Sequence, residues 1–591
     1  MAFAENDRLR TGWSEKRQEI PMRGHTLTWL GAALALVFLL AGTGEAHGGQ
    51  YTGPKPGGVG TPRRGPTGAP RGGGVTAGLT PSWRDWWDRN REEFFNVLAR
   101  RQSKADPATP EEEQNEGASA LFQPLTEEEL RTLVRPLIVA ALADKSAEVR
   151  DAAAIALGRA GAIPQLEALK VALKDSRKSV REAATLGIAL LHHPMAEQVL
   201  VDRLTQTDLG HRERGITALA LGLSGGKRAF KALTDRLGKD GALRRVSRAK
   251  AREVEGARVY ALGLIGTDAA RAAITSALSS HSTKDSTFIP MALTALAHCG
   301  DPSSAGDVFR YLGHKKREIR RSAAIAAGRV ATKKDKKWVQ LLVRRQASEK
   351  DMLARNFMLF SLGRIGGDQA VKTLRSVFRK DRQRAARAVA AVALGIARAT
   401  TEIPALRKAV TAGKDETLRG AAAIALGIMG DRAAARDILK VLDGTGNPAL
   451  QADLVTALGM LEAEEAGPAV RTLIARARNG RLVQACGYYL AVAGDSESID
   501  LLLSLLEKSG SIQVKGGVAT ALGRSHDGRA AKRLASIVES ARSTDQTRAF
   551  AIVALGLIAD RVPISDFARV SIDSNYALQN ADALREVIDI F

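Results

Sequence analysis

Small apolar residues recur along most of the chain in one short pattern. The heptapeptide AAAIALG occupies residues 152–158 and returns unchanged at residues 421–427. Looser versions include VREAATLGIAL at residues 180–190 and VKGGVATALGRS at residues 514–525. Aligning the glycine that closes the pattern defines thirteen units, two of which have alanine instead: Gly158, Gly187, Gly222, Gly263, Ala297, Gly328, Gly363, Gly395, Gly427, Gly459, Ala491, Gly523 and Gly556. From position 363 to position 523 the spacing is 32 residues throughout, which indicates a tandem repeat.

Each unit predicts two helices. Glycine inside a helix costs about 1 kcal/mol relative to alanine, so its return in one register indicates helices whose backbones approach each other closely. A break such as Gly430-Asp431 follows, where glycine suits the left-handed residue that ends a helix and aspartate caps the next. The second helix places apolar residues at Ala434, Ile438 and Val441 or Leu442. The pattern therefore predicts an all-α fold, an α-α superhelical solenoid of about 13 helical-hairpin repeats within residues 126–591.

The repeat resembles a known family. The pattern VRxxAAxALGxxGD followed by AxxxLxxxL is similar to the short HEAT-like repeat first noted in phycobilisome lyases, and it covers roughly residues 126–570. The resemblance implies helical hairpins whose second helices line a concave face. The segments HGGQYTGP and SNYALQNADALREVIDIF, together with a Trp-rich helix, also resemble a group of secreted bacterial HEAT-repeat proteins of unassigned function.

The N-terminal region has the features of an export signal. Residues 26–44 carry no charge, follow a basic residue and lead into small residues. This predicts a signal peptide over residues 1–46, cleaved after Ala46. The alternatives are an uncleaved transmembrane anchor, for which the stretch is just long enough, and a buried helix. Met22 is a second candidate start. The expected location is extracytoplasmic, periplasmic or secreted, with anchoring by a single N-terminal transmembrane helix as the alternative.

Three further segments precede the repeats. Residues 47–81 are rich in Gly and Pro and predict a flexible linker. Residues 82–104 predict a helix with a Ser82–Asp85 capping box and with Trp83, Trp87 and Phe94 on one face. Its aromatic face is either a binding platform or a cap over the open end of the repeat array, and we favour the N-terminal capping helix. Residues 105–125 form an acidic loop.

Composition narrows the function only in part. The 87 Lys and Arg against 64 Asp and Glu give a formal net charge of +23, which favours acidic partners, although solubility alone is an equal explanation. The two cysteines, Cys299 and Cys486, exclude a disulfide-rich fold and a cysteine-based zinc site. Some HEAT-like repeat enzymes, the deoxyhypusine hydroxylases, bind two irons through His-Glu pairs. None of the nine histidines here is followed by Glu.

One region departs from the rest in charge. Residues 312–387 contain 22 Lys or Arg and 6 Asp or Glu, a net of +16. Cations at the predicted start of a second helix oppose its macrodipole and cost about 0.3–1 kcal/mol each. If second helices line the concave face, these cations form a basic trough; the alternative is a solvated charged surface. The candidate binding residues are Lys333, Lys334, Lys336, Lys337, Arg344, Arg345, Arg379, Lys380, Arg382 and Arg384.

The sequence therefore predicts a non-catalytic extracytoplasmic scaffold that mediates protein–protein or other macromolecular interaction through its repeat surface. It predicts no catalytic residue, no cofactor, no metal and no small-molecule substrate. A protein partner, acidic or neutral, is expected, and a membrane only through an uncleaved N-terminal segment. Two alternatives stay open: a basic-trough binder of nucleic acid or another polyanion, and an exported enzyme of unrecognised type.

Overall fold

The computed structural model describes residues 82–94, 123–237, 247–493, 497–560 and 566–572, together with residues 574 and 584. The predicted signal segment 1–46 and linker 47–81 lie outside the described residues, as do residues 95–122, which hold most of the predicted acidic loop. Among the described residues, no helix combines the length and apolar character that crossing a bilayer requires.

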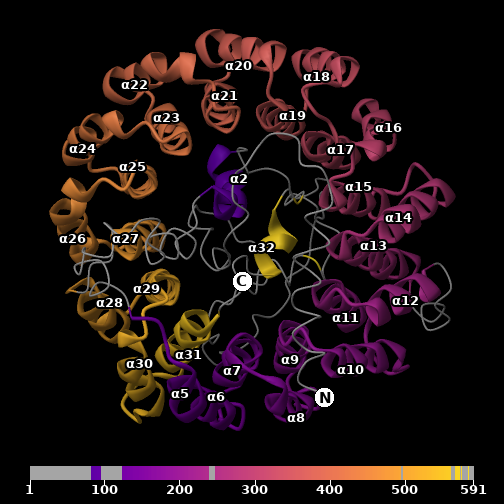
Figure 1. Cartoon of the computed structure of the whole chain (residues 1–591), viewed down its shortest axis with the longest axis vertical. Helices are drawn as coiled ribbons and strands as arrows, with labels where there is room; N and C mark the ends of the chain where they lie inside the picture. The colour runs from indigo at the N-terminus through magenta and orange to yellow at the C-terminus, as the bar shows by residue number, and fades with distance from the viewer. Residues whose placement is uncertain are drawn as a thin grey trace, which may run out of the picture.

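Thirteen helical hairpins follow one another around a ring, with one helix of each in an inner layer and one in an outer layer (Figure 1). The outer helices of the described chain are α6 (Arg135–Ala141), α8 (Leu166–Ala172), α10 (Pro194–Thr205), α12 (Lys227–Arg236), α14 (Asp268–Ser280), α16 (Ala305–Phe309), α18 (Lys336–Ser348), α20 (Asp368–Lys380), α22 (Ile403–Ala412), α24 (Ala435–Asp443), α26 (Gly467–Arg476), α28 (Glu497–Lys508) and α30 (Arg529–Glu539). A short α5 (Glu127–Glu129) and a π-helical turn (Leu130–Val134) lead into α6.

The inner helices carry the repeated small-residue pattern. They are α7 (Ala147–Ala160), α9 (Lys178–Leu190), α11 (His211–Ser224), α13 (Arg248–Ile265), α15 (Phe288–Cys299), α17 (Arg317–Val330), α19 (Met352–Ile365), α21 (Arg384–Ile396), α23 (Glu416–Met429), α25 (Pro448–Met460), α27 (Gly480–Ala493), α29 (Ile512–Ser525) and α31 (Asp545–Ala559). Each of the thirteen aligned Gly or Ala positions falls in its own inner helix, so the predicted all-α solenoid and its repeat number are confirmed.

Small residues explain why these helices form the inner layer. A Cβ atom added to Gly222 would lie 2.7 Å from the Cα of Ala261, and one added to Gly395 would lie 2.7 Å from the Cα of Ala425. The inner circumference of a ring is shorter than the outer one, so only helices with small side chains at their contacts fit there. The expectation that second helices line the concave face is therefore wrong: the second helices lie outside.

The two ends of the array meet. Helix α31 packs against α7, and a Cβ added to Gly556 would lie 2.7 Å from the Cα of Ala156. Arg548 of α31 forms an ion pair with Asp144, just before α7. In the outer layer the N–H of Gly528 donates to the carbonyl oxygen of Gln123 at 2.6 Å. The solenoid is thus a closed ring, and a full turn over thirteen units corresponds to a rotation of about 28° per repeat.

The break between inner and outer helices follows the predicted pattern with one difference. Gly430 has φ +75°, the left-handed conformation expected after α23. Asp431 follows it, but its side chain accepts hydrogen bonds from Arg407 of the preceding unit, at 2.7 Å each, instead of capping the next helix. Ala434, Ile438, Val441 and Leu442 are all buried, as the spacing predicted.

Two short helices lie inside the ring. They are α2 (Trp83–Asn90), continued by a 3-10 turn over Arg91–Glu93, and α32 (Asp566–Ser571) (Figure 1). The prediction of an end-capping helix at residues 82–104 is therefore wrong for its described part. Because α31 packs on α7, the described array has no open end to cover, and the apolar face of α2 is buried against inner helices instead.

Candidate functional site

In the lumen of the ring, polar and aromatic side chains of α2 contact side chains of the inner helices. We call α2 with its 3-10 turn, residues 82–93, the lumen segment. It begins beside the N-terminal ends of α23 and α25 and ends beside the C-terminal ends of α17 and α19. The segment therefore runs through the ring in the same direction as the inner helices.

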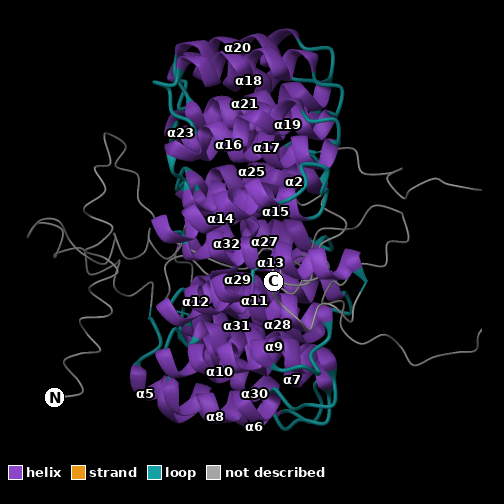
Figure 2. Ribbon diagram, turned by 90° about the vertical axis from the view of Figure 1, so that its right-hand side faces the viewer, coloured by secondary structure: helices purple, strands orange, loops and turns teal. Residues whose placement is uncertain are grey.

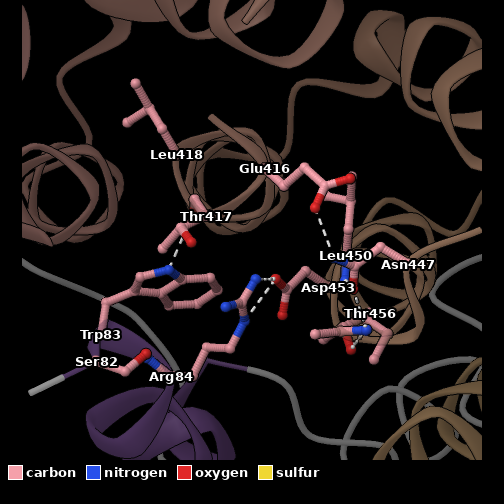
Figure 3. A network of polar contacts seen from close by, with 12 residues as sticks. Ser82, Trp83, Arg84, Glu416, Thr417, Leu418, Asn447, Leu450, Asp453 and Thr456 are labelled. Carbon is pink, nitrogen blue, oxygen red and sulfur yellow. Dashed lines mark hydrogen bonds and ion pairs between the residues drawn. The ribbon is translucent and has the colours of Figure 1, made fainter. Parts of the chain in front are cut away.

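Local sequence determines the start of the segment. The Ser82 hydroxyl accepts from the N–H of Arg84 at 3.2 Å, and the Asp85 carboxylate accepts from the N–H of Ser82 at 3.1 Å. This is the predicted capping box. The Trp83 indole N–H donates to the carbonyl oxygen of Thr417 at 3.2 Å, in the first turn of α23 (Figure 3). The cap thus fixes the first turn where the ring wall begins.

Aromatic side chains supply the apolar part of the contact. Trp83, Trp86 and Trp87 are each at most 1% exposed. The Trp86 ring stacks on Phe360 of α19, with 4.0 Å between centroids. The Trp87 and Phe94 rings lie 5.9 Å apart, so these two residues share a face as predicted. Full burial of a tryptophan contributes several kcal/mol to a contact of this kind.

Arginines from the ring wall bind the carboxylates of the lumen segment. Arg329 and Arg364 pair with Glu93, at 2.8 and 2.7 Å. Arg524 pairs with Glu92. We call Arg329, Arg364, Arg481 and Arg524 the lumen arginines; they belong to α17, α19, α27 and α29. They reach the segment from well-separated parts of the ring, so the contact depends on the closed architecture.

A second ion-pair network lies near the start of the segment. Arg481 pairs with Asp88 at 3.4 Å and with Asp453 of α25 at 2.8 Å. Arg84 of the segment pairs with the same Asp453 at 2.6 Å (Figure 3). The Asp453 side chain is fully buried. Breaking a buried pair by removing one partner costs about 3–5 kcal/mol, because the remaining charge is left uncompensated.

The electrostatics follow from this pairing. Burial alone would raise the pKa of Glu93, but the Arg329 and Arg364 guanidiniums outweigh it and lower the pKa to about 2. Burial would lower the pKa of Arg481, but Asp88 and Asp453 raise it above its usual value. Burial also raises the pKa of Tyr488, whose hydroxyl donates to Glu92 at 3.0 Å. The Glu93 carboxylate and the Arg481 guanidinium therefore stay charged at moderate pH.

The C-terminal helix α32 shares the lumen. The Tyr260 hydroxyl donates to the carbonyl oxygen of Val570 at 2.6 Å. Arg569 donates to the carbonyl oxygen of Leu264, and Ser571 donates to that of Arg89 at 3.3 Å. Segments from both ends of the chain are thus bound inside one ring.

The charged groups of the lumen form ion pairs around a bound segment of the chain. The carboxylates of Asp88, Glu92, Glu93 and Asp453 are each engaged by guanidinium groups. In the part of the chain that the structure describes, no three His, Cys, Asp or Glu side chains are grouped so as to hold a metal ion. Cys299 and Cys486 are free thiols, in α15 and α27 on opposite sides of the ring.

The ten predicted basic residues do not line the lumen. All are exposed, but the outer helices run between two faces of the ring on which the loops gather (Figure 2). We call the face where inner helices begin the N-face, and the face where they end the C-face. Lys333, Lys334, Lys336 and Lys337 lie at the C-face, whereas Arg344, Arg345, Arg379, Lys380, Arg382 and Arg384 lie at the N-face.

The structure therefore corrects the predicted trough. Helix α18 has 13 residues, so its ends are about 20 Å apart at 1.5 Å per residue. Lys336 and Lys337 at its start cannot act with Arg344 and Arg345 near its end as one concave surface. Arg379 is moreover paired with Glu402 at 2.9 Å.

Sequence reasoning missed the lumen site, although two signals were present. Three of the six tryptophans fall within five residues, among acidic side chains. An arginine also follows the pattern glycine directly at Arg159, Arg329, Arg364 and Arg524. Three of these four are lumen arginines, and Arg159 lies 3.9 Å from Asp560 at the seam between α31 and α7.

Comparisons with known proteins identify the repeat. Family models described as HEAT repeats match residues 166–253 and 336–427, a HEAT repeat model matches residues 134–162, and a PBS lyase HEAT-like repeat model matches residues 418–444. No curated protein matches the chain.

Several solved structures match the chain at low sequence identity. The CpcE–CpcF complex of phycocyanin lyase from Nostoc sp. PCC7120 is 21% identical, with a TM-score of 0.28, over 39% of this chain and 86% of that chain. Human deoxyhypusine hydroxylase is 18% identical, with a TM-score of 0.21, over 45% of this chain and 96% of that chain. Importin beta is 13% identical, with a TM-score of 0.31, over 78% of each chain.

Proposed function

Because the chain is a HEAT-like repeat protein, we propose that it is a non-catalytic interaction scaffold whose ring lumen binds a short, acidic and aromatic helical segment. HEAT-like repeats support a role in protein interaction. The observation that carries the proposal is the lumen segment itself, a peptide bound by four arginines of the wall and by the Trp86–Phe360 stack. A partner segment with the same chemistry fits the same contacts.

The intramolecular segment sets the conditions under which a partner can bind. A segment joined to its site by a short chain has an effective concentration in the millimolar range. A free peptide therefore competes poorly with residues 82–93 of the native chain. Weakening the intramolecular segment, while leaving the ring wall unchanged, should open the lumen to a peptide added in solution.

The test uses the full chain with Trp86→Ala, Glu92→Gln and Glu93→Gln, all within the lumen segment. A labelled synthetic peptide of residues 80–96 is titrated, and fluorescence anisotropy reports binding. We expect micromolar binding to the triple variant and at least about tenfold weaker binding to the native chain. The matched control is the same peptide carrying the three substitutions, which should bind neither protein.

Equal binding of the native peptide to both proteins would contradict the proposal, as would no binding to a triple variant that keeps native helical content by circular dichroism. An exported enzyme of unrecognised type, the second of the two alternatives, would instead be revealed by turnover of a substrate that the peptide does not inhibit.

The extracytoplasmic location is part of the proposal and rests on the uncharged residues 26–44. N-terminal sequencing of the native protein should find His47 as the first residue. An intact chain in the membrane fraction would support the anchor instead. An intact chain in the cytosol would contradict both.

A further inference from the structure

Exposed cations surround the N-face of the ring. Thirteen connections join an outer helix to the following inner helix at this face, and nine of them carry an exposed Lys or Arg among their described residues; the other four join α10 to α11, α12 to α13, α24 to α25 and α28 to α29. Lys145, Lys174, Lys284, Lys315, Lys350 and Lys414 represent six different connections. The charge is therefore distributed around the circumference and is not one local cluster.

Acidic residues of the same connections are turned into the ring. Asp175 pairs with Arg150 at 2.7 Å, and Asp351 pairs with Arg321 at 2.7 Å. Both aspartates are less exposed than their lysine neighbours on these loops. The ion pairs between successive units thus occupy these carboxylates, while neighbouring lysines such as Lys174 and Lys350 stay exposed.

Four of these cations stand where helix stability disfavours them. Lys178, Arg248, Arg317 and Arg384 are the first residues of α9, α13, α17 and α21. A cation there opposes the positive end of the helix macrodipole, whereas Asp or Glu would be favoured. Lys178 and Arg317 offset part of this cost by pairing with Glu182 at 3.5 Å and Glu318 at 3.0 Å, and an external anion would favour cations at all four positions.

The C-face has a different distribution of cations. Lys333, Lys334, Lys336 and Lys337 gather at a single connection there. Exposed acidic residues occur at both faces, such as Asp268 and Glu464 at the C-face and Asp208 and Glu416 at the N-face. The lumen segment adds a second asymmetry. Its first residue, Ser82, lies at the N-face end of the lumen, beside the first turn of α23. Ser82, the first described residue, therefore lies at the basic face.

We propose that the N-face binds the surface of a bilayer containing anionic phospholipids. The loops of this face gather at one side of the ring (Figure 2), so a planar anionic surface can meet cations from most of the circumference together. A linear polyanion would contact only an arc of the ring.

The experiment measures binding of the full chain to vesicles of phosphatidylcholine alone and with 30% phosphatidylserine, by co-sedimentation. Binding to phosphatidylcholine alone reports the apolar stretch, and the excess on phosphatidylserine reports the N-face. The N-face variant replaces Lys145, Lys174, Lys284, Lys315, Lys350 and Lys414 with Gln. We expect the phosphatidylserine-dependent binding of this variant to be weaker than that of the native chain by about 100-fold or more, since each Lys near an anionic surface contributes appreciably.

The matched control removes the same charge from the opposite face. The C-face variant replaces Lys227, Lys333, Lys334, Lys336, Lys337 and Lys372 with Gln. Its phosphatidylserine-dependent binding should be weaker than that of the native chain by less than about threefold. Native binding should weaken as salt is raised. Equal losses in the two variants, or no serine-dependent excess in the native chain, would overturn the proposal. Tighter binding of duplex DNA or heparin than of vesicles, lost in the same N-face variant, would replace the bilayer with a linear polyanion.

Discussion

The seam between α31 and α7 closes the ring with the contacts that join neighbouring units elsewhere. Between α21 and α23 a Cβ on Gly395 would lie 2.7 Å from a Cα of the next unit, and at the seam a Cβ on Gly556 would lie equally close to Ala156. Arg150 pairs with Asp175 of the following unit at 2.7 Å, and Arg548 pairs with Asp144 in the same way. Closure therefore needs no dedicated motif.

The seam nevertheless differs from the internal interfaces in its acidic groups. Glu148 of α7 faces Asp545 of α31, and burial together with this neighbour raises the pKa of Glu148 to about 7. At the α7–α9 interface the carboxylate of Asp175 instead accepts hydrogen bonds from Arg150, which lowers its pKa. Uniform packing thus closes the ring, while Glu148 makes the seam sensitive to pH. Asp151 of α7, whose pKa is raised by burial to about 7, adds a similar sensitivity beside α9.

The largest expected effect tests the packing at the seam. Gly556→Leu and Gly395→Leu each force a side chain against backbone atoms of the next helix, and each should lower the free energy of unfolding by about 3 kcal/mol. Chemical denaturation measures both. Gly306→Leu is the control, because nothing lies within 4 Å of a Cβ there, and it should change stability by less than about 1 kcal/mol.

If the ring is open in solution, the two variants should differ in stability. Gly395→Leu would keep its full cost, whereas Gly556→Leu would resemble the control at Gly306. The maximum dimension measured by small-angle scattering would then also exceed that of the closed ring.

A smaller effect tests the ion pair across the seam. Asp144 and Arg548 are 404 residues apart in sequence and touch only if the ring is closed. A double-mutant cycle with Asp144→Ala and Arg548→Ala should give a coupling energy of about 1 kcal/mol, because the pair is partly exposed. The cycle on Asp175 and Arg150 should give a similar value. Coupling within error of zero for the first pair, beside a clear value for the second, would show that the seam is open.

The sequence determined the repeats but not how they close. The repeated glycine located each inner helix, because the small residues that let neighbouring helices approach closely are visible in the sequence itself. Closure depends on the sum of thirteen small rotations of about 28° each. An error of a few degrees per unit converts a ring into a superhelix, and no single residue encodes that sum.

The sequence analysis predicted neither which helix of each hairpin lies on the inner side nor the lumen site, and the two reasons are related. The basic residues were assigned to a concave face because HEAT-like arrays were expected to curve toward their second helices. The Gly395–Ala425 approach requires the opposite curvature. Trp86 and Glu93 meet Phe360 and Arg364 across more than 270 residues of sequence, so only the closed ring brings these partners together.

The smallest expected effect is a pH dependence that belongs to the seam. The pKa of Glu148 is about 7 in the folded chain, against an ordinary value of 4.5. The folded state therefore binds this proton more tightly than the unfolded state, and the free energy of unfolding should fall as pH rises from about 4.5 to about 7. Glu148→Gln should reduce the slope of this part of the profile, to which Asp151 also contributes because burial raises its pKa to about 7. At pH 8 it should make the ring more stable by on the order of 1 kcal/mol, less than the full pKa shift implies because the group is only half-buried. Glu128→Gln, on an exposed side chain, is the control and should leave the profile unchanged. Thermal unfolding at half-unit steps from pH 4.5 to pH 8 measures all three proteins, and a Glu148→Gln profile parallel to the native one would contradict the raised pKa of Glu148 at the seam.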